Sequence, residues 1–156
     1  YEYLFPRSKK MKGITIRKRH PTVSEFRRLR GAAVWPVPDE AVVQRAVRGG
    51  LFSYCAEKDG EAIGMARVIG DGAIYYYVQD VIVLPEYRKQ AIGTLLMNAV
   101  MGEINSQTPT GGYIALFSAP GLQHFYARYG FVERPVGKLG PGMVYMKKRA
   151  EEDCAE

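Results

Sequence analysis

The sequence predicts an α/β domain built on a mixed β-sheet with helices on both faces. Two strand-like stretches, 51–57 and 61–69, flank an Asp59-Gly60 turn signal, which is typical of an antiparallel hairpin. Further along, helical spacing over 91–100 separates the apolar stretches 73–84 and 113–117. A helix between two strands is the usual crossover of a parallel pair, so hairpins and crossover together indicate a mixed sheet.

The first half of the chain adds one strand and two helices to this sheet. Residues 13–19 alternate between apolar and polar side chains and predict a strand, and Thr22 or Ser24 is suited to begin the helix that follows. Prolines at 36 and 38 end that helix, Asp39 begins a second one, and Gly49-Gly50 ends it. The expected apolar face of the second helix carries Ala41, Val42, Ala46 and Val47.

The C-terminal part is expected to contain a short helix over 123–129 and two last strands over 131–134 and 143–148, separated by the glycine-rich 137–142. Residues 1–11 and 150–156 are polar and are interpreted as an extension and a tail. One domain over 12–149 is therefore predicted for these 156 residues.

Composition narrows the class of protein. Hydrophobic residues make up 47% and charged residues 24%, and the net charge is +6. No apolar run approaches the roughly 20 residues of a membrane span, and no secretory leader pattern is present. Two cysteines do not make a disulfide framework, so we expect a cytoplasmic protein. The basic residues form no nucleic-acid motif, and His20 and His124 are too isolated to suggest a metal site.

The central stretch is a strand, a basic turn and a helix start. Apolar residues run to Val83, Pro85 breaks them, and a turn over 86–90 leads into the helical pattern. The unpaired amides of a first helical turn bind anions, and Arg88 and Lys89 add charge beside them. We interpret this stretch as a diphosphate cradle. It lacks the Gly-Lys-Ser/Thr ending of a nucleoside-triphosphate loop and the three glycines of the dinucleotide fingerprint.

Within this stretch, Arg88-Lys89-Gln90-Ala91-Ile92-Gly93 resembles the coenzyme-A loop of the GNAT (Gcn5-related N-acetyltransferase) superfamily, Arg/Gln-x-x-Gly-x-Gly/Ala, with Ala91 in place of the middle glycine. Phe125 to Phe131 resembles the closing motif of the same family, whose tyrosine corresponds to Tyr126. The order of predicted elements over 13–149 is also that of the GNAT fold.

The resemblance implies acetyl-CoA as cofactor and a site for it. The thioester and pantetheine would meet the backbone of Val81, Ile82 and Val83. The diphosphate would lie on residues of the turn and helix start, namely Arg88, Lys89, Gln90, Ala91, Ile92, Gly93 and Thr94.

The chemistry of acetyl transfer assigns two catalytic candidates. The leaving thiolate has a pKa of roughly 8.5 to 10, and a phenol with a pKa of about 10 can protonate it, which suits Tyr126 as general acid. The attacking amine must lose a proton, and the strand before the turn offers Tyr77, Gln79 and Asp80 as candidates for the base. Asp80 is the only carboxylate among them, so we expect it to act as base through water. Around the acceptor we expect Trp35, Tyr77, Gln79, Phe117 and Ser118.

The function predicted from the sequence is an acetyl-CoA-dependent N-acetyltransferase that moves the acetyl group directly to a primary amine of a small molecule. Two alternatives stay open: acetylation of protein lysines or N-termini, and a non-catalytic acyl-CoA sensor. We expect neither nucleic acid nor membrane as partner. Because two-fold dimers are the commonest assembly, a homodimer also stays open.

Overall fold

The computed structural model describes residues 13–108 and 110–147, which fall into two compact units divided after Phe117. The predicted extension at 1–11 and tail at 150–156 lie outside the described residues. The first unit holds the sheet and three α-helices, and the second holds a short helix and the chain that follows it. Each unit is described by itself below.

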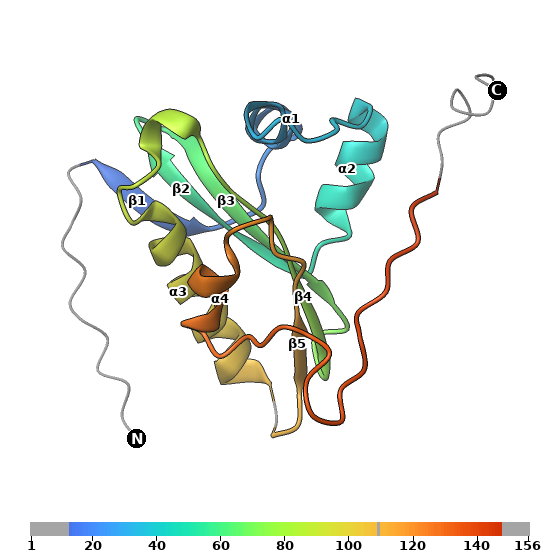
Figure 1. The fold of residues 1–156 in the computed structure, drawn as a ribbon. Helices are drawn as coiled ribbons and strands as arrows, with labels where there is room; N and C mark the ends of the chain where they lie inside the picture. Colours follow the sequence, from blue (N-terminus) through green and yellow to red (C-terminus); the bar gives the residue numbers. More distant parts are fainter. Residues whose placement is uncertain (1–12, 109, 148–156) are drawn as a thin grey trace. The chain divides into compact units, whose positions relative to one another are not determined.

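The first unit is built on a five-stranded mixed sheet, as predicted (Figure 1). The strands, in both spatial and sequence order, are β1 (Ile14–Lys18), β2 (Phe52–Lys58), β3 (Glu61–Gly70), β4 (Tyr75–Val83) and β5 (Tyr113–Ala115). The first four pair antiparallel, whereas β5 lies parallel to β4. Asp59 and Gly60, with φ of 51° and 83°, turn β2 into β3 as the Asp-Gly signal predicted.

Helices cover both faces of this sheet (Figure 1). On one face, α3 (Ile92–Gln107) contacts β1 to β4, and on the other, α1 (Val23–Ala32) contacts β3 and β4. The helix α2 (Glu40–Arg48) packs beside α1. Apolar side chains from both faces make the core, among them Leu29 from α1 and Leu96, Met97, Val100 and Ile104 from α3, none of which is exposed.

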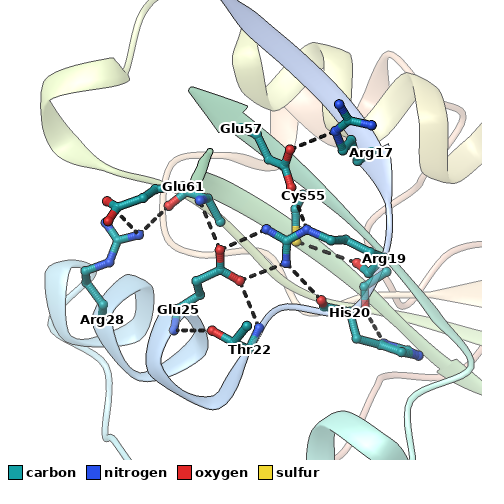
Figure 2. Close-up of polar contacts among 11 residues, drawn as sticks. Arg17, Arg19, His20, Thr22, Glu25, Arg28, Cys55, Glu57 and Glu61 are labelled. Carbon is teal, nitrogen blue, oxygen red and sulfur yellow. Dashed lines mark hydrogen bonds and ion pairs between the residues drawn. The ribbon is translucent and has the colours of Figure 1, made fainter. Parts of the chain in front are cut away.

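A dense ionic network fixes the start of α1 to the sheet (Figure 2). Thr22 and Glu25 exchange hydrogen bonds in a capping box, with the Glu25 amide donating to Thr22 Oγ1 at 3.1 Å. Arg19 donates to both oxygens of Glu25 at 2.8 Å and to Glu57 of β2 at 2.5 Å. Glu25 also accepts from the amide of Ala62 in β3. One carboxylate therefore joins the helix start, the end of β1 and β3.

Two details of the first unit differ from the prediction. The buried residues of α2 are Val43 and Val47, four apart on one face, whereas Val42 is exposed, so the predicted apolar face was rotated. The strand expected over 113–117 ends at Ala115 and is half-buried, and Phe117 is exposed. A strand at the edge of a sheet pairs on one side only, which leaves its side chains less covered than an apolar run suggests.

The second unit contains α4 (Gln123–Ala127), shorter than the predicted 123–129. No strand forms in the described part of 131–148, so the prediction of two last strands is wrong up to residue 147. Val136 and Leu139 make only an isolated bridge, and Met143 and Tyr145 are 90% and 87% exposed. Apolar residues predict a strand only where a neighbouring ladder can take up their backbone groups.

Candidate functional site

The turn between β4 and α3 carries the predicted diphosphate cradle. A 3₁₀ turn (Pro85–Tyr87) ends β4, and Arg88 donates from Nε to the Val83 carbonyl at 3.2 Å. Lys89 and Ala91 both have left-handed backbones, with φ of 60° and 57°, on either side of Gln90, which does not. Alternation of this kind turns successive N–H groups toward one concave side, which is the geometry of an anion site.

The cradle continues into the first turn of α3. Ala91 is the residue that caps this helix, and its side chain makes no capping hydrogen bond. The amides of Ile92 and Gly93 stand in the first turn, where no earlier helical carbonyl can accept from them. Arg88, Lys89, Gln90 and Ala91 are exposed. The arrangement therefore offers backbone donors and two cationic side chains at the positive end of a 16-residue helix.

Upstream of the cradle, β4 is paired on one side only. Its pairing with β3 extends to Val83, but β5 pairs only with Tyr75, Tyr76 and Tyr77. Among the described residues no strand lies beside 78–83 on the β5 side. The backbone of Val81, Ile82 and Val83 thus belongs to an open strand edge, and an extended ligand can add to such an edge as a further strand.

A bulge interrupts β4 at Asp80. Met65 pairs with Ile82 and Arg67 with Gln79, so Asp80 and Val81 together face the single residue Ala66. Asp80 has a φ of 52°, a left-handed conformation that aspartate adopts more readily than most side chains. Bulges of this kind redirect side chains and interrupt a ladder next to functional sites.

The Asp80 carboxylate is held by two arginines inside the first unit. Its side chain is 1% exposed, and it accepts from Arg30 Nη1 at Oδ1 (2.5 Å) and from Arg67 Nη1 at Oδ2 (2.7 Å). Gln79 Nε2 lies 3.5 Å from Oδ1. Both oxygens therefore already accept charge-assisted hydrogen bonds.

Three of the residues expected around the acceptor, Trp35, Tyr77 and Phe117, make aromatic contacts in the first unit. Trp35 is half-buried, and the Arg30 guanidinium lies 5.4 Å from its ring centroid, so Arg30 joins Trp35 to Asp80. Tyr77 meets Phe117 edge to face at 5.7 Å between ring centroids. Burial raises the pKa of Tyr77, and a hydrogen bond from the Phe117 backbone opposes that rise.

The remaining candidates lie in the second unit. Tyr126 is a buried residue of α4, and its ring packs edge to face against Phe125 and Phe131 at 5.0 and 6.3 Å between centroids. Burial raises the pKa of its phenol, which therefore stays protonated at neutral pH. Ser118 donates its hydroxyl hydrogen to the Ala119 carbonyl at 2.9 Å.

Arg30 and Arg67 are the two residues of this region that the sequence analysis missed. Arg67 carried a usable signal, because it is the one charged residue inside the apolar run Ala62 to Ile69. A charge in a buried strand requires a partner. Arg30 carried none, since its helix holds three other arginine or glutamate residues and resembles a solvated face. In the described part of the chain, no three His, Cys, Asp or Glu side chains gather as a metal site requires.

Fold and site together define an α/β domain with an open strand edge that leads into a helix start with exposed backbone donors and two cationic side chains. A family model described as "Acetyltransferase (GNAT) domain" matches residues 50–133, more than half of the 156. The chain belongs to the GNAT acetyltransferase family, as its motifs indicated, and the N-acetyltransferase class predicted for it is the class of that family.

Relatives and solved structures agree with this assignment. The chain is 31% identical over 76% of its length to GCN5-related N-acetyltransferase 1, chloroplastic, of Arabidopsis thaliana, and spans 59% of that protein. A probable acetyltransferase from meticillin-resistant Staphylococcus aureus superposes with a TM-score of 0.79 at 26% identity, over 86% of this chain and 99% of the other. An aminoglycoside N-acetyltransferase in complex with CoA shares the fold, with a TM-score of 0.59 at 20% identity over 90% and 99%.

The comparisons leave the predicted location without support. Curated relatives are named as chloroplastic proteins, so the cytoplasm stays a prediction. Within residues 13–108 and 110–147, no helix is both long and apolar enough to cross a membrane.

Proposed function

We propose that this protein transfers an acetyl group from acetyl-CoA directly to the primary amine of a small molecule. The observation that carries the proposal is the continuity of the open β4 edge, from Val78 to Val83, with the left-handed turn and the start of α3. An extended thioester arm and a diphosphate need these two features in this order along one ligand. Membership in the GNAT family supports the same cofactor.

In this proposal the cofactor is bound largely by backbone. The pantetheine arm adds to the edge at Val81, Ile82 and Val83, and their N–H groups serve the thioester oxygen as it gains charge. The diphosphate lies on the turn and first helical turn, with Arg88 and Lys89 as added charges. The residues assigned to the diphosphate are Arg88, Lys89, Gln90, Ala91, Ile92, Gly93 and Thr94.

The reaction forms one bond and breaks one. The amine nitrogen attacks the thioester carbon, and the carbon–sulfur bond breaks, so that the electron pair leaves on sulfur as thiolate. Tyr126 supplies the proton that the thiolate takes up, because its buried phenol, whose pKa is raised, carries a proton at neutral pH. The amine attacks in its neutral form, and the proton that its nitrogen loses passes to solvent water. We do not carry Asp80 into the proposal as the base, since Arg30 and Arg67 occupy both of its oxygens.

The charges of the first unit bear on the acceptor. A polycationic amine needs carboxylates, and the sequence offers Asp39, Glu40, Asp71 and Asp80 around this region. Glu40 pairs with Arg27 at 3.2 Å, and Asp71 accepts from the amides of residues 73, 74 and 75 at 2.8 to 2.9 Å. Asp80 forms ion pairs with two arginines, Arg30 and Arg67. Asp39 makes no capping hydrogen bond with its side chain, and this one remaining carboxylate does not match several positive charges. We therefore propose a neutral or singly charged amine rather than a polyamine or an aminoglycoside.

A thiol-release assay with acetyl-CoA and a panel of amines tests the proposal. The panel contains small monoamines, amino acids, spermidine, an aminoglycoside and a lysine peptide, with hydrolysis in the absence of amine as control. We expect turnover with a monoamine or an amino acid and little with the polycations. Turnover only with the peptide would assign the protein to protein acetylation, and binding of acetyl-CoA without turnover on any amine would contradict the enzymatic proposal.

A further inference from the structure

Arg30 connects three parts of the first unit that are distant in sequence. It lies in the last turn of α1, donates from Nη1 to Asp80 of β4 at 2.5 Å, and donates from Nε to the Pro36 carbonyl at 3.0 Å. Its guanidinium is also 5.4 Å from the ring centroid of Trp35. The segment after α1 is thus attached to the bulge of β4 through a single side chain.

Arg67 makes the corresponding connection to the second helix. From β3 it donates Nη1 to Asp80 at 2.7 Å and Nη2 to the Ala46 carbonyl, in the last turns of α2, at 2.6 Å. Both guanidiniums also make cation–π contacts with Phe26 of α1, whose ring centroid lies 5.6 Å from Arg30 Cζ and 5.1 Å from Arg67 Cζ. Asp80 consequently receives one arginine bound to the α1–α2 segment and one bound to α2.

The burial of the cluster makes this arrangement dependent on Asp80. The side chains of Arg30 and Arg67 are 17% and 5% exposed, and Asp80 is the one carboxylate in ion-pair contact with either among the described residues. Two guanidiniums this close to one another repel unless a counter-charge lies between them. Removal of the carboxylate would therefore release Arg30 first, because it is the more exposed of the two.

We propose that Asp80 is a positioning residue, which through Arg30 and Arg67 holds the α1–α2 segment with Trp35 and Pro36 against the bulged part of β4. Its consequence for catalysis rests on the proposed function. There the α1–α2 segment forms the acceptor-side wall, which faces the amine, and Asp80 fixes the position of that wall relative to β4, along which the acetyl group is bound. Asp80 acts through Arg30 and does not touch the reacting atoms. Substitution of Arg30 and substitution of Asp80 should then have the same effect. If Asp80 were instead the general base, its substitution would lower the rate of reaction and that of Arg30 would not.

Trp35 is the only tryptophan of the chain, so its fluorescence reports on the segment without any ligand. The test compares wild type, Arg30→Met and Asp80→Asn by acrylamide quenching, with folding checked by circular dichroism. Asparagine tolerates the left-handed backbone at position 80. Arg30→Met leaves Asp80 paired with Arg67, so Arg30→Met stays informative if Asp80→Asn fails to fold. Glu57→Gln is the control, because it removes a carboxylate that pairs with Arg17 and Arg19 and not with Arg30 or Arg67, while Arg19 keeps its pair with Glu25.

We expect both Arg30→Met and Asp80→Asn to raise the quenching of Trp35, and Glu57→Gln to match wild type. In turnover, both should raise the KM for the amine by about tenfold and leave the affinity for CoA unchanged, because they loosen an acceptor-side wall and not the cradle. Unchanged quenching in a folded Arg30→Met protein would overturn the proposal. So would a loss in kcat of about 10²-fold or more for Asp80→Asn alone, which would make Asp80 the base. The quenching experiment tests the positioning role even if the protein acetylates no amine, because it requires no turnover.

Discussion

The carbonyl of Ala91 accepts a hydrogen bond from the amide of Leu95 at 3.0 Å, while Ala91 itself has a left-handed φ of 57°. The helix α3 therefore begins on a residue whose Cβ disfavours the conformation it adopts. Glycine, which the GNAT coenzyme-A loop has at this position, adopts the same backbone without that cost. The departure from the family pattern is thus a matter of backbone strain in the proposed cradle.

Ala91→Gly is expected to raise the free energy of unfolding by about 1 kcal/mol, since it removes the strain of a left-handed alanine. Chemical denaturation measures the change. Ala99→Gly is the matched control, because Ala99 lies inside α3 and glycine there should lower stability by about 0.5 to 1 kcal/mol. A destabilised Ala91→Gly protein would contradict the strain at this cap.

Tyr126→Phe is expected to lower kcat by about 10²-fold or more and to leave the affinity for CoA unchanged, because it removes a proton donor and keeps the ring contacts with Phe125 and Phe131. Steady-state kinetics and calorimetry measure the two effects. Tyr145→Phe, at an exposed tyrosine of the same unit, should behave as wild type. A near-native kcat in Tyr126→Phe would remove Tyr126 from the role of acid.

The pH dependence of that role follows from the raised pKa of Tyr126. A group raised by burial keeps its proton until the pH exceeds its ordinary value of about 10. We therefore expect the rate of the wild-type enzyme to show no loss assignable to Tyr126 below about pH 10. A rate profile that falls near pH 8 in wild type, and does not in Tyr126→Phe, would be inconsistent with this environment.

Glu25→Gln is expected to lower the free energy of unfolding by about 1 to 2 kcal/mol at pH 7, through loss of the ion pair with Arg19 and of the negative charge at the helix start. The hydrogen bond from Arg19 lowers the pKa of Glu25 from 4.5 to about 2. A lowered folded-state pKa stabilises the fold above pH 4.5, and this contribution disappears as the pH falls toward 2.

The difference between wild type and Glu25→Gln should accordingly shrink between about pH 4.5 and pH 2. Denaturation at several pH values measures it. Glu40→Gln is the control, because the exposed pair of Glu40 with Arg27 contributes about 0 to 0.5 kcal/mol at any pH. A pH-independent difference for Glu25→Gln would mean that the carboxylate is not held in its charged form.

Local patterns were enough to predict the elements of the first unit, because each pattern and its consequence lie close in sequence. Each local pattern determines the secondary structure of the residues that carry it, as in the alternation before Lys18, the Thr22 cap and the Asp59-Gly60 turn. The turn at the start of α3 was predictable for the same reason, and its assignment as a diphosphate cradle stays a prediction. Its residues are consecutive, and their effect comes from the backbone of one turn.

The partners of Asp80 were not predictable in this way. Arg30 is 50 residues away along the chain, and its inward direction depends on how α1 lies on the sheet. The bulge that turns Asp80 inward results from the register between β3 and β4, which the sequence of β4 alone does not reveal. The prediction of the two last strands was wrong for a related reason. The apolar residues near Met143 form a strand only if a neighbouring strand edge pairs with their backbone.

The most direct test of the account is calorimetric titration of acetyl-CoA into wild type, Gly93→Leu and Gly102→Leu. Both glycines lie in α3, but Gly93 is in the first turn, where the diphosphate is proposed to bind, and a side chain at Gly102 would meet nothing within 4 Å. We predict binding at one site per chain in wild type and Gly102→Leu, and at least a tenfold loss in Gly93→Leu. No binding in wild type, or full affinity in Gly93→Leu, would contradict the assignment of this turn as the CoA site.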